Sequence, residues 1–268
     1  MASLPPSHPL KKHIKAAARN RKRYKSPLHQ LYDAFSIDVK EMETINPTRH
    51  HPKWSPKLKI IIHDDPLDTI AHDIQAEIEN DICLYSDGSG FEGSIGGAAV
   101  LKRGGRTKKT LKFHLGSDKK HTVYEGEEVG MILAAELIRN EHQARKISLG
   151  VDSKAAIQAA RSSKTAPGHY LMDLFHETLA STLETVEAEE ITIRWTPGHV
   201  GIPGNEEADV AAKEAAQGTT STPTLLPSTL KCGRTKTTLP TSKPATESSP
   251  TKQNAYKRKS SKPPPAPH

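Results

Sequence analysis

Apolar residues recur with two different periods along the middle of the chain, and each period predicts a different kind of element. Short runs rich in apolar and β-branched residues, bounded by glycine or charged positions, predict five strands at 81–87, 93–103, 108–116, 146–152 and 191–196. The first strand runs into an Asp-Gly-Ser-Gly sequence, which is typical of a turn. A period near 3.6 predicts helices at 122–140, 153–161, 169–184 and 205–217.

The order of these elements is β-β-β-α-β-α-α-β-α. Three hairpin-connected strands pair antiparallel, whereas strands joined through helices become parallel. We therefore expect an α/β fold with a five-stranded mixed sheet, three antiparallel strands followed by parallel strands, flanked by helices.

The pattern fades outside residues 81–217. Residues 1–80 are expected to be a mostly extended connector with a basic N-terminus, containing one short helix in "SPLHQLYDAF" and an isolated apolar run, "LKIIIHDD". Residues 218–268 are rich in Ser, Thr, Pro and Lys, and we expect a disordered basic tail. The composition agrees, because 34% hydrophobic residues and 20 prolines leave a good fraction of the chain outside any core.

The net charge of +7 is concentrated at the two ends of the chain, which favours a polyanionic partner such as nucleic acid. A solvated tail without a partner is the alternative. No apolar run approaches the length of a bilayer span and the N-terminus has no apolar signal core, so we expect no membrane partner. Two distant cysteines, Cys83 and Cys232, favour a reducing compartment, and we expect an intracellular protein of the cytoplasm or nucleus.

Four acidic residues occupy the ends of predicted elements. Asp87 and Asp152 end two strands, Glu127 lies early in the helix between them, and Asp209 lies in the last helix. Strand ends form the crevice where α/β sheets bind ligands, and clustered carboxylates repel one another unless cations join them. Oxygen ligands suit Mg²⁺ or Mn²⁺, and two such ions about 3.5–4 Å apart are the usual arrangement for attack on a phosphodiester.

The stretch "RWTPGHVGIPGNEEAD" places His199 on a loop rich in glycine and proline, ten positions before Asp209. An alternative interpretation is a plain helix N-terminus, with Asn205 as its cap and acids at the positive end of the helix dipole.

The four blocks "YSDGS", "YEGEEVGMILAAEL", "VDSKAAI" and "WTPGHVGIPGNEEAD" resemble the motifs of type 1 ribonuclease H. They resemble most closely the ribonuclease H domain that follows reverse transcriptase in fungal non-LTR retrotransposons, and the connector resembles the segment that links the two. No Tyr-x-Asp-Asp polymerase motif is present. The resemblance implies a detached C-terminal piece or standalone copy, with a reverse transcriptase fused upstream in the intact element.

The resemblance also implies a ribonuclease H-like fold and an endonuclease that hydrolyses the RNA strand of RNA/DNA hybrids with two Mg²⁺ ions, Mn²⁺ being an alternative. We expect a monomer. The metal ligands and catalytic carboxylates would be Asp87, Glu127, Asp152 and Asp209, with His199 on a mobile loop that helps product or metal leave. The residues that would contact the hybrid are Gly88, Ser89, Asn205 and Glu206. An inactive nucleic-acid-binding relic of a retroelement is the alternative.

One position stays open between three acids. The family usually has Glu-Leu where this chain has Glu127-Glu128, with Glu125 also near. We choose Glu127 because its spacing to Gly130 and Ala134 places it on one face of small and apolar residues.

Overall fold

The computed structural model describes residues 12, 16, 19, 27–35, 58–62, 66–164, 166 and 168–230. It divides the chain into one unit of residues 1–42 with 244–268 and another of residues 43–243. The first unit contains helix α2 (Pro27–Phe35), at the place of the predicted short helix, and the elements discussed below belong to the second. Among the described residues, no helix combines the length and the apolar character that crossing a bilayer requires.

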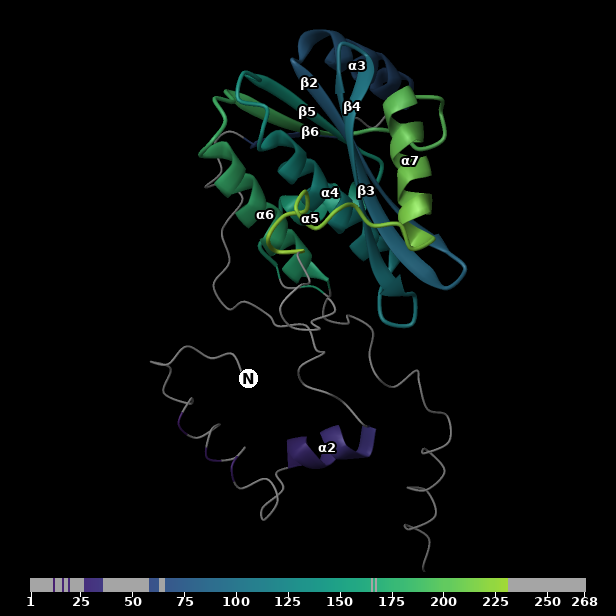
Figure 1. The fold of residues 1–268 in the computed structure, drawn as a ribbon, viewed down its shortest axis with the longest axis vertical. Coiled ribbons are helices and arrows are strands. Elements are labelled where there is room, and N and C mark those ends of the chain that lie inside the picture. Colours follow the sequence, from purple (N-terminus) through teal and green to yellow (C-terminus); the bar gives the residue numbers. More distant parts are fainter. Residues whose placement is uncertain are drawn as a thin grey trace, which may run out of the picture. The chain divides into compact units, whose positions relative to one another are not determined.

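A six-stranded mixed sheet forms the centre of the second unit (Figure 1). Its strands lie in the order β1-β6-β5-β2-β3-β4. Strands β2, β3 and β4 pair antiparallel, and β1, β6, β5 and β2 pair parallel, which confirms the predicted mixed sheet. The strand bounds are β1 Leu58–Ile61, β2 Ile82–Phe91, β3 Ser94–Arg103, β4 Arg106–Ser117, β5 Lys146–Val151 and β6 Glu190–Trp195.

Two details of the sheet differ from the prediction. The isolated apolar run at 58–61 is a sixth strand, β1, which pairs in parallel with β6 although it lies in the predicted connector. The Asp-Gly-Ser-Gly sequence is not a turn, because β2 continues to Phe91 and the chain reverses at Glu92 and Gly93, which have φ angles of 45° and 80°. Gly88 admits the backbone of helix α4 (Val123–Ile138) instead of ending the strand.

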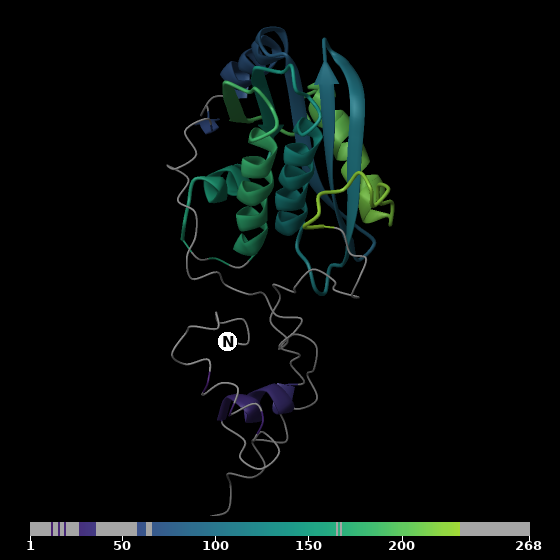
Figure 2. The same cartoon turned by 60° about the vertical axis from the view of Figure 1, so that its left-hand side comes forward.

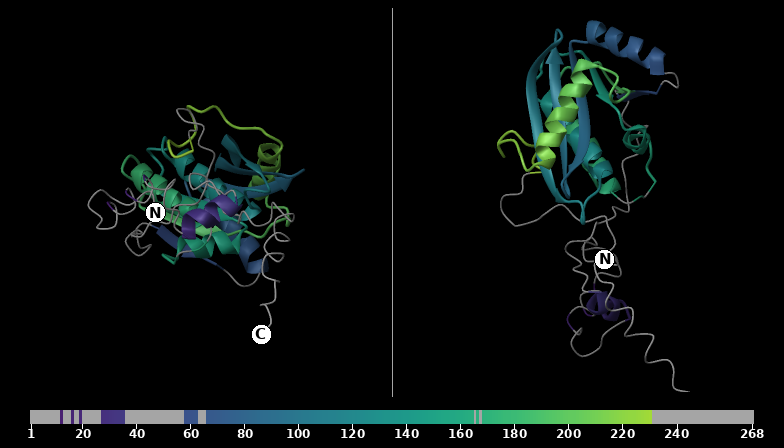
Figure 3. Two further views of the ribbon diagram at one scale, coloured as in Figure 1. Left: turned by 90° about the horizontal axis from the view of Figure 1, so that it is seen from below. Right: turned by 90° about the vertical axis from the view of Figure 1, so that its right-hand side faces the viewer.

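Helices cover both faces of the sheet. One face carries α4 (Val123–Ile138) and α6 (His169–Leu183) side by side, with the short helix α5 (Lys154–Ala160) next to them (Figure 2). The opposite face carries α7 (Pro203–Ala216), which crosses β2, β3 and β4 (Figure 3). Helix α3 (Pro66–Glu79) lies on the α7 side, where Cys83 of β2 contacts its backbone.

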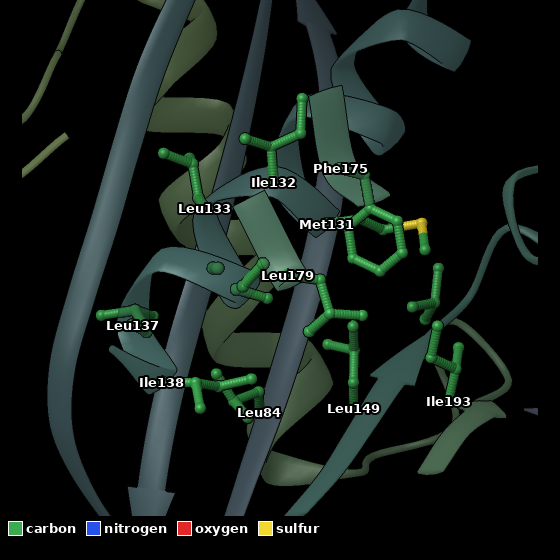
Figure 4. Close-up of a cluster of buried hydrophobic side chains, with 14 of the residues drawn as sticks. Leu84, Met131, Ile132, Leu133, Leu137, Ile138, Leu149, Phe175, Leu179 and Ile193 are labelled. Carbon is green, nitrogen blue, oxygen red and sulfur yellow. The ribbon is translucent and has the colours of Figure 1, made fainter. Parts of the chain in front are cut away.

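The main hydrophobic core lies between the sheet and helices α4 and α6 (Figure 4). Leu84 and Leu149 contribute from the strands, while Met131 and Phe175 contribute from the two helices. All four side chains are buried. Their close packing fixes the position of α4 relative to the sheet.

Residues after α7 continue along the edge of the sheet. The Ser221 amide donates to the Lys112 carbonyl of β4, and the Lys112 amide donates to the Ser221 hydroxyl. Leu226 and Leu230 then join the main core and are each 3% exposed. The predicted tail therefore begins with a packed segment. The connector prediction also missed helix α3, since residues 66–79 are helical and not extended. The remaining predictions for the tail and the N-terminal connector concern residues 231–268, most of 1–57 and 63–65, which lie outside the described residues.

Candidate active site

Glycines bring α4 against the centre of the sheet. A Cβ atom added to Gly88 of β2 would lie 2.2 Å from the Glu127 backbone nitrogen, and one added to Gly130 would lie 2.9 Å from the Asp87 carbonyl oxygen. A Cβ atom cannot approach another atom this closely, so both positions require glycine. The backbones of β2 and α4 are therefore in direct contact. The consequence is that Glu127, on the first turns of α4, reaches the side chain of Asp87.

Three carboxylates meet at this contact. One oxygen each from Asp87, Glu127 and Asp152 lie within 4.8 Å of one another. Asp87 is 5% exposed, Glu127 is 9% exposed, and Asp152, directly after β5, is partly buried. Within the described part of the chain, Glu127 Oε2 and Asp152 Oδ1 are buried without a hydrogen-bond partner. Oxygen atoms in this state fit a bound divalent cation, since buried carboxylates otherwise need donors or a positive charge.

The burial of these acids and their proximity to one another raise their pKa values. Burial, followed by the charges of Asp152 and Asp209, raises the pKa of Asp87 to about 8. Burial and the charges of Asp152 and Asp87 raise the pKa of Glu127 well above its usual range. Burial also raises the pKa of Asp152, with Asp209 adding to the rise and His199 opposing it. A cation in the site would reverse these shifts, because it favours the charged carboxylates.

A second group faces the first from the start of α7. His199, Glu206 and Asp209 each offer one ligand atom within 4.8 Å of the others. The charge of Asp209 acts on both Asp87 and Asp152, so the four predicted carboxylates gather in one region. The helix begins with Pro203 and its N-cap is Ile202. The alternative interpretation that made Asn205 the cap is therefore wrong, because proline already occupies the first turn.

The loop before α7 lies against Asp152. A Cβ atom on Gly198 would be 3.2 Å from Asp152 Oδ2, and the next residue, His199, has a left-handed backbone with φ of 58°. His199 is exposed, and the Gly201 amide donates to the Glu206 carboxylate at 3.3 Å. The histidine is thus held beside the acidic group on an exposed loop.

The four predicted substrate contacts lie in different surroundings. The Gly88 amide is buried and donates to Asp87 Oδ1 at 2.8 Å. Ser89 lies partly exposed, one position further along β2. Asn205 is 2% exposed, and its Oδ1 has no hydrogen-bond partner among the described residues, whereas Glu206 is partly exposed. Gly88 therefore orients a carboxylate, and Glu206 belongs to the second group with His199 and Asp209.

The structure separates the three glutamates at the start of α4. Glu125 forms a capping box with Thr122, whose amide donates to its carboxylate at 2.8 Å. Glu128 lies near Tyr124, whose pKa is raised by burial and by the charge of Glu128, and its Oε2 lies 3.3 Å from the place of a Cβ on Gly168, where α6 begins. Of the three, only Glu127 belongs to the group with Asp87.

Two further residues, Trp195 and Lys213, contact members of the acidic group, and these contacts were not predicted from the sequence. Trp195 Nε1 donates to the Asp152 carbonyl at 2.9 Å, and Lys154 Nζ lies 3.7 Å from the centre of its ring. Lys213 pairs with Asp209 at 2.6 Å, four residues along α7. The i, i+4 spacing of Asp209 and Lys213 was visible in the sequence. The contact of Trp195 depends on how the strands are arranged.

Fold and site together define an α/β protein with an acidic group where the parallel pairing of β2 with β5 ends, at Ser86 and Val151. The prediction that Asp87 ends its strand is wrong, because β2 continues to Phe91 in its pairing with β3. The chain belongs to the RNase H family, whose model matches residues 79–217, more than half of its length. A comparison with curated protein sequences gives no match.

Several solved structures resemble the chain at low sequence identity. The N-terminal RNase H domain of a Mycobacterium tuberculosis protein is 19% identical with a TM-score of 0.41; the match covers 51% of this chain and 94% of that one. RNase H1 from Halobacterium salinarum is 20% identical with a TM-score of 0.39, over 52% and 98% of the two chains. LC11-RNase H1, solved in complex with an RNA/DNA hybrid, is 17% identical with a TM-score of 0.40, over 51% and 97%. The family assignment follows from the family match alone.

Proposed function

We propose that the protein is an endoribonuclease that cuts the RNA strand of RNA/DNA hybrids with the help of two divalent metal ions. The observation that carries this proposal is the group of Asp87, Glu127 and Asp152, whose oxygens lie within 4.8 Å of one another. Two buried oxygens of this group lack a hydrogen-bond partner among the described residues. Hard oxygen donors without thiolates favour Mg²⁺ or Mn²⁺ over zinc.

The chain's own residues set the geometry for this chemistry. Asp87, Glu127 and Asp152 would hold one side of the metal site, and Asp209 would approach from α7. When bound, two metal ions activate the attacking water and stabilise the leaving oxygen of a phosphodiester. The Gly88 amide and the backbone contact of α4 with β2 keep the carboxylates in place before substrate arrives. Hydrolysis of a phosphodiester bond requires catalytic groups that are preorganised in this way.

The substrate class is proposed from family membership and from the four motif blocks. An RNA/DNA duplex is recognised by its shape, its backbone and its 2′-hydroxyl groups, without sequence reading. Ser89 lies partly exposed two residues after Asp87, Glu206 lies partly exposed in the group with His199 and Asp209, and Asn205 has an amide oxygen without a hydrogen-bond partner among the described residues. These three side chains are the proposed contacts to the hybrid, and His199 on its exposed loop is proposed to help product or metal leave.

We further propose that the domain derives from a fungal non-LTR retrotransposon, in which a reverse transcriptase precedes it. The support is the resemblance of the four blocks and of the connector sequence. In this proposal the protein acts as a monomer on hybrids such as those that reverse transcription leaves behind.

Incubation of the purified 268-residue chain with an end-labelled RNA/DNA hybrid tests the proposal. We expect cleavage of the RNA strand with Mg²⁺ or Mn²⁺, 5′-phosphate and 3′-hydroxyl products, and no cleavage with EDTA. Asp87→Asn and Asp152→Asn should each abolish cleavage while hybrid binding, measured by fluorescence anisotropy, stays within about threefold. Binding without cutting by the wild-type chain under both metals would overturn the proposal in favour of an inactive relic.

A further inference from the structure

Helix α3 carries a buried carboxylate although nearly all of the helix lies outside the family match. The helix spans Pro66–Glu79, and the match begins at residue 79. Asp73 on this helix is 2% exposed, whereas its neighbour Ile74 is 59% exposed. Burying an acid while exposing an isoleucine is costly unless the acid is paired. The position of Asp73 therefore calls for a specific set of partners.

Asp73 binds groups from two strands of the sheet. Its Oδ2 accepts a hydrogen bond from the Tyr85 hydroxyl of β2 at 3.0 Å. Its Oδ1 accepts one from the Thr196 hydroxyl at 3.1 Å and forms an ion pair with Arg194 of β6 at 2.5 Å. One carboxylate thus joins α3, β2 and the end of β6. Each partner is itself buried, so these bonds are shielded from water.

Thr196, which Asp73 contacts, also bonds to the residue before Asp152 of the acidic group. The Thr196 amide donates to the Val151 carbonyl at 2.9 Å, and Val151 precedes Asp152. In the other direction the chain runs from Thr196 through Pro197 and Gly198 to His199, which is exposed and has left-handed backbone. Few other side-chain hydrogen bonds among the described residues hold this loop. The hydrogen bond from the Thr196 hydroxyl to Asp73 therefore connects α3 to the beginning of the loop.

The Tyr85 contact leads to the start of α7. Tyr85 lies two residues before Asp87, so both side chains point to the same face of β2. A Cβ atom on Gly204, the second residue of α7, would lie 2.1 Å from the Tyr85 ring. The first turn of α7 therefore rests on the ring whose hydroxyl Asp73 holds. The same hydroxyl also lies 2.9 Å from the Glu77 carboxylate of α3. Both ends of the His199 loop are thus connected to α3, at Thr196 through Asp73 and at Gly204 through the Tyr85 ring, which contacts Asp73 and Glu77.

We infer that Asp73 is a positioning residue, which holds the loop of residues 196–204 so that His199 stays beside the acidic group. The inference rests on the proposed function, since it assigns α3 a part in the same site. It makes α3 an integral part of the nuclease domain, because a chain cut at the boundary of the family match would lose this carboxylate. Such a chain would also leave the Arg194 guanidinium buried without its acid.

Variants of the full chain test this. Asp73→Asn keeps the shape of the side chain, Thr196→Val removes only the hydroxyl at the loop, and Asp68→Asn is the matched control on the exposed side of α3. Hydrogen–deuterium exchange without substrate should show faster exchange in residues 196–204 for Asp73→Asn and Thr196→Val, with no change for Asp68→Asn. Exchange in 196–204 equal to wild type in both variants would overturn the inference.

Kinetics on the hybrid separate positioning from general stability. Asp73→Asn and Thr196→Val should lower kcat roughly tenfold and leave KM within about twofold. In a His199→Ala background the same substitutions should change kcat by less than about twofold, because the residue that the loop presents is already gone. An equal loss in both backgrounds would overturn the positioning role. If the wild-type chain cuts no hybrid, the proposed function fails, and the exchange experiment still decides whether Asp73 holds the loop.

Discussion

Gly88 and Glu127 touch through their backbones, with 2.2 Å between the Glu127 nitrogen and the place where a Cβ on Gly88 would lie. The Gly88→Ala variant must therefore push α4 away from β2 and separate Glu127 from Asp87. We expect a loss of stability of about 1–3 kcal/mol from overpacking. We also expect a loss of cleavage of roughly 100-fold, since a displacement near 1 Å at a reacting centre has this effect.

Gly90→Ala is the matched control for this prediction, because it is the same substitution on the same strand at an exposed position. A Cβ there would meet the exposed side chain of Val123 at 3.2 Å instead of a backbone. Urea unfolding and hybrid cleavage should both stay close to wild type for Gly90→Ala. Equal activities of Gly88→Ala and Gly90→Ala would mean that the close contact between β2 and α4 does not determine the geometry of the acidic group.

The three glutamates at the start of α4 predict three different outcomes. Glu127→Gln should lower cleavage on the order of 100-fold or more, because it removes a charge aimed at the proposed cations. Glu125→Gln should keep activity and lose about 1–3 kcal/mol of stability, because glutamine also serves in a capping box but Glu125 is buried and its carboxylate lies 3.5 Å from buried His121 Nδ1. Glu128→Gln should keep activity and lose up to about 1 kcal/mol of stability, because its charge lies at the start of α6. Side-by-side cleavage and urea unfolding decide between them, and a severe activity loss in Glu125→Gln or Glu128→Gln would contradict the assignment.

The sequence indicated the acidic group because Asp87 and Asp152 each follow an apolar run that forms a parallel strand. The parallel pairing of the two strands ends just before both acids, although β2 itself continues to Phe91. The contacts of Asp73 and Trp195 were not predicted, because they join segments that are distant in the sequence. The start of α7 was misread although Pro203 marked it, since the asparagine two residues later is itself a good cap.

Two errors in the fold have a similar cause. The run at 58–61 is too short to be recognised as a strand, and only pairing with β6 makes it one. The segment after residue 218 has the composition of a disordered tail, yet two leucines in it find space in the core. Composition describes an average over a segment, whereas burial depends on single side chains and on what they meet.

The packed segment after α7 gives a prediction of its own. Leu226 is 3% exposed and belongs to the core, whereas its neighbour Leu225 is 58% exposed. Leu226→Ala should lower the free energy of unfolding by about 2–5 kcal/mol, the usual range for a buried leucine. Leu225→Ala is the matched control and should change it by less than about 0.5 kcal/mol. Similar unfolding midpoints for the two variants would show that the segment does not stabilise the domain in solution.

Lys213 should weaken metal binding in the wild-type protein. Its ammonium group pairs with Asp209 Oδ2 at 2.6 Å and is half exposed, so it competes with a cation for the same carboxylate. Lys213→Ala should therefore lower the Mg²⁺ concentration for half-maximal cleavage by up to about fivefold, the limit for an exposed ion pair. Lys213→Arg keeps the charge and should leave that concentration nearly unchanged. A rise in the Mg²⁺ requirement of Lys213→Ala would instead indicate that Lys213 contacts the substrate.

The raised pKa of Asp87 predicts how stability without metal depends on pH. Burial and two neighbouring acids raise this pKa from 3.8 to about 8, so the folded state holds a proton that the unfolded state releases. Stability from this group is therefore complete below pH 4 and is lost between about pH 4 and pH 8, by at most about 1.4 kcal/mol per pH unit. In EDTA, Asp87→Asn should become progressively more stable than wild type across this range, and Mg²⁺ should stabilise the wild type more at pH 8 than at pH 6. Thermal unfolding of both proteins at several pH values measures the difference, in which the titrations of groups distant from Asp87 cancel, while those of its neighbours Glu127 and Asp152 contribute with it. Parallel curves for wild type and Asp87→Asn would show that the carboxylates are not crowded as the structure places them.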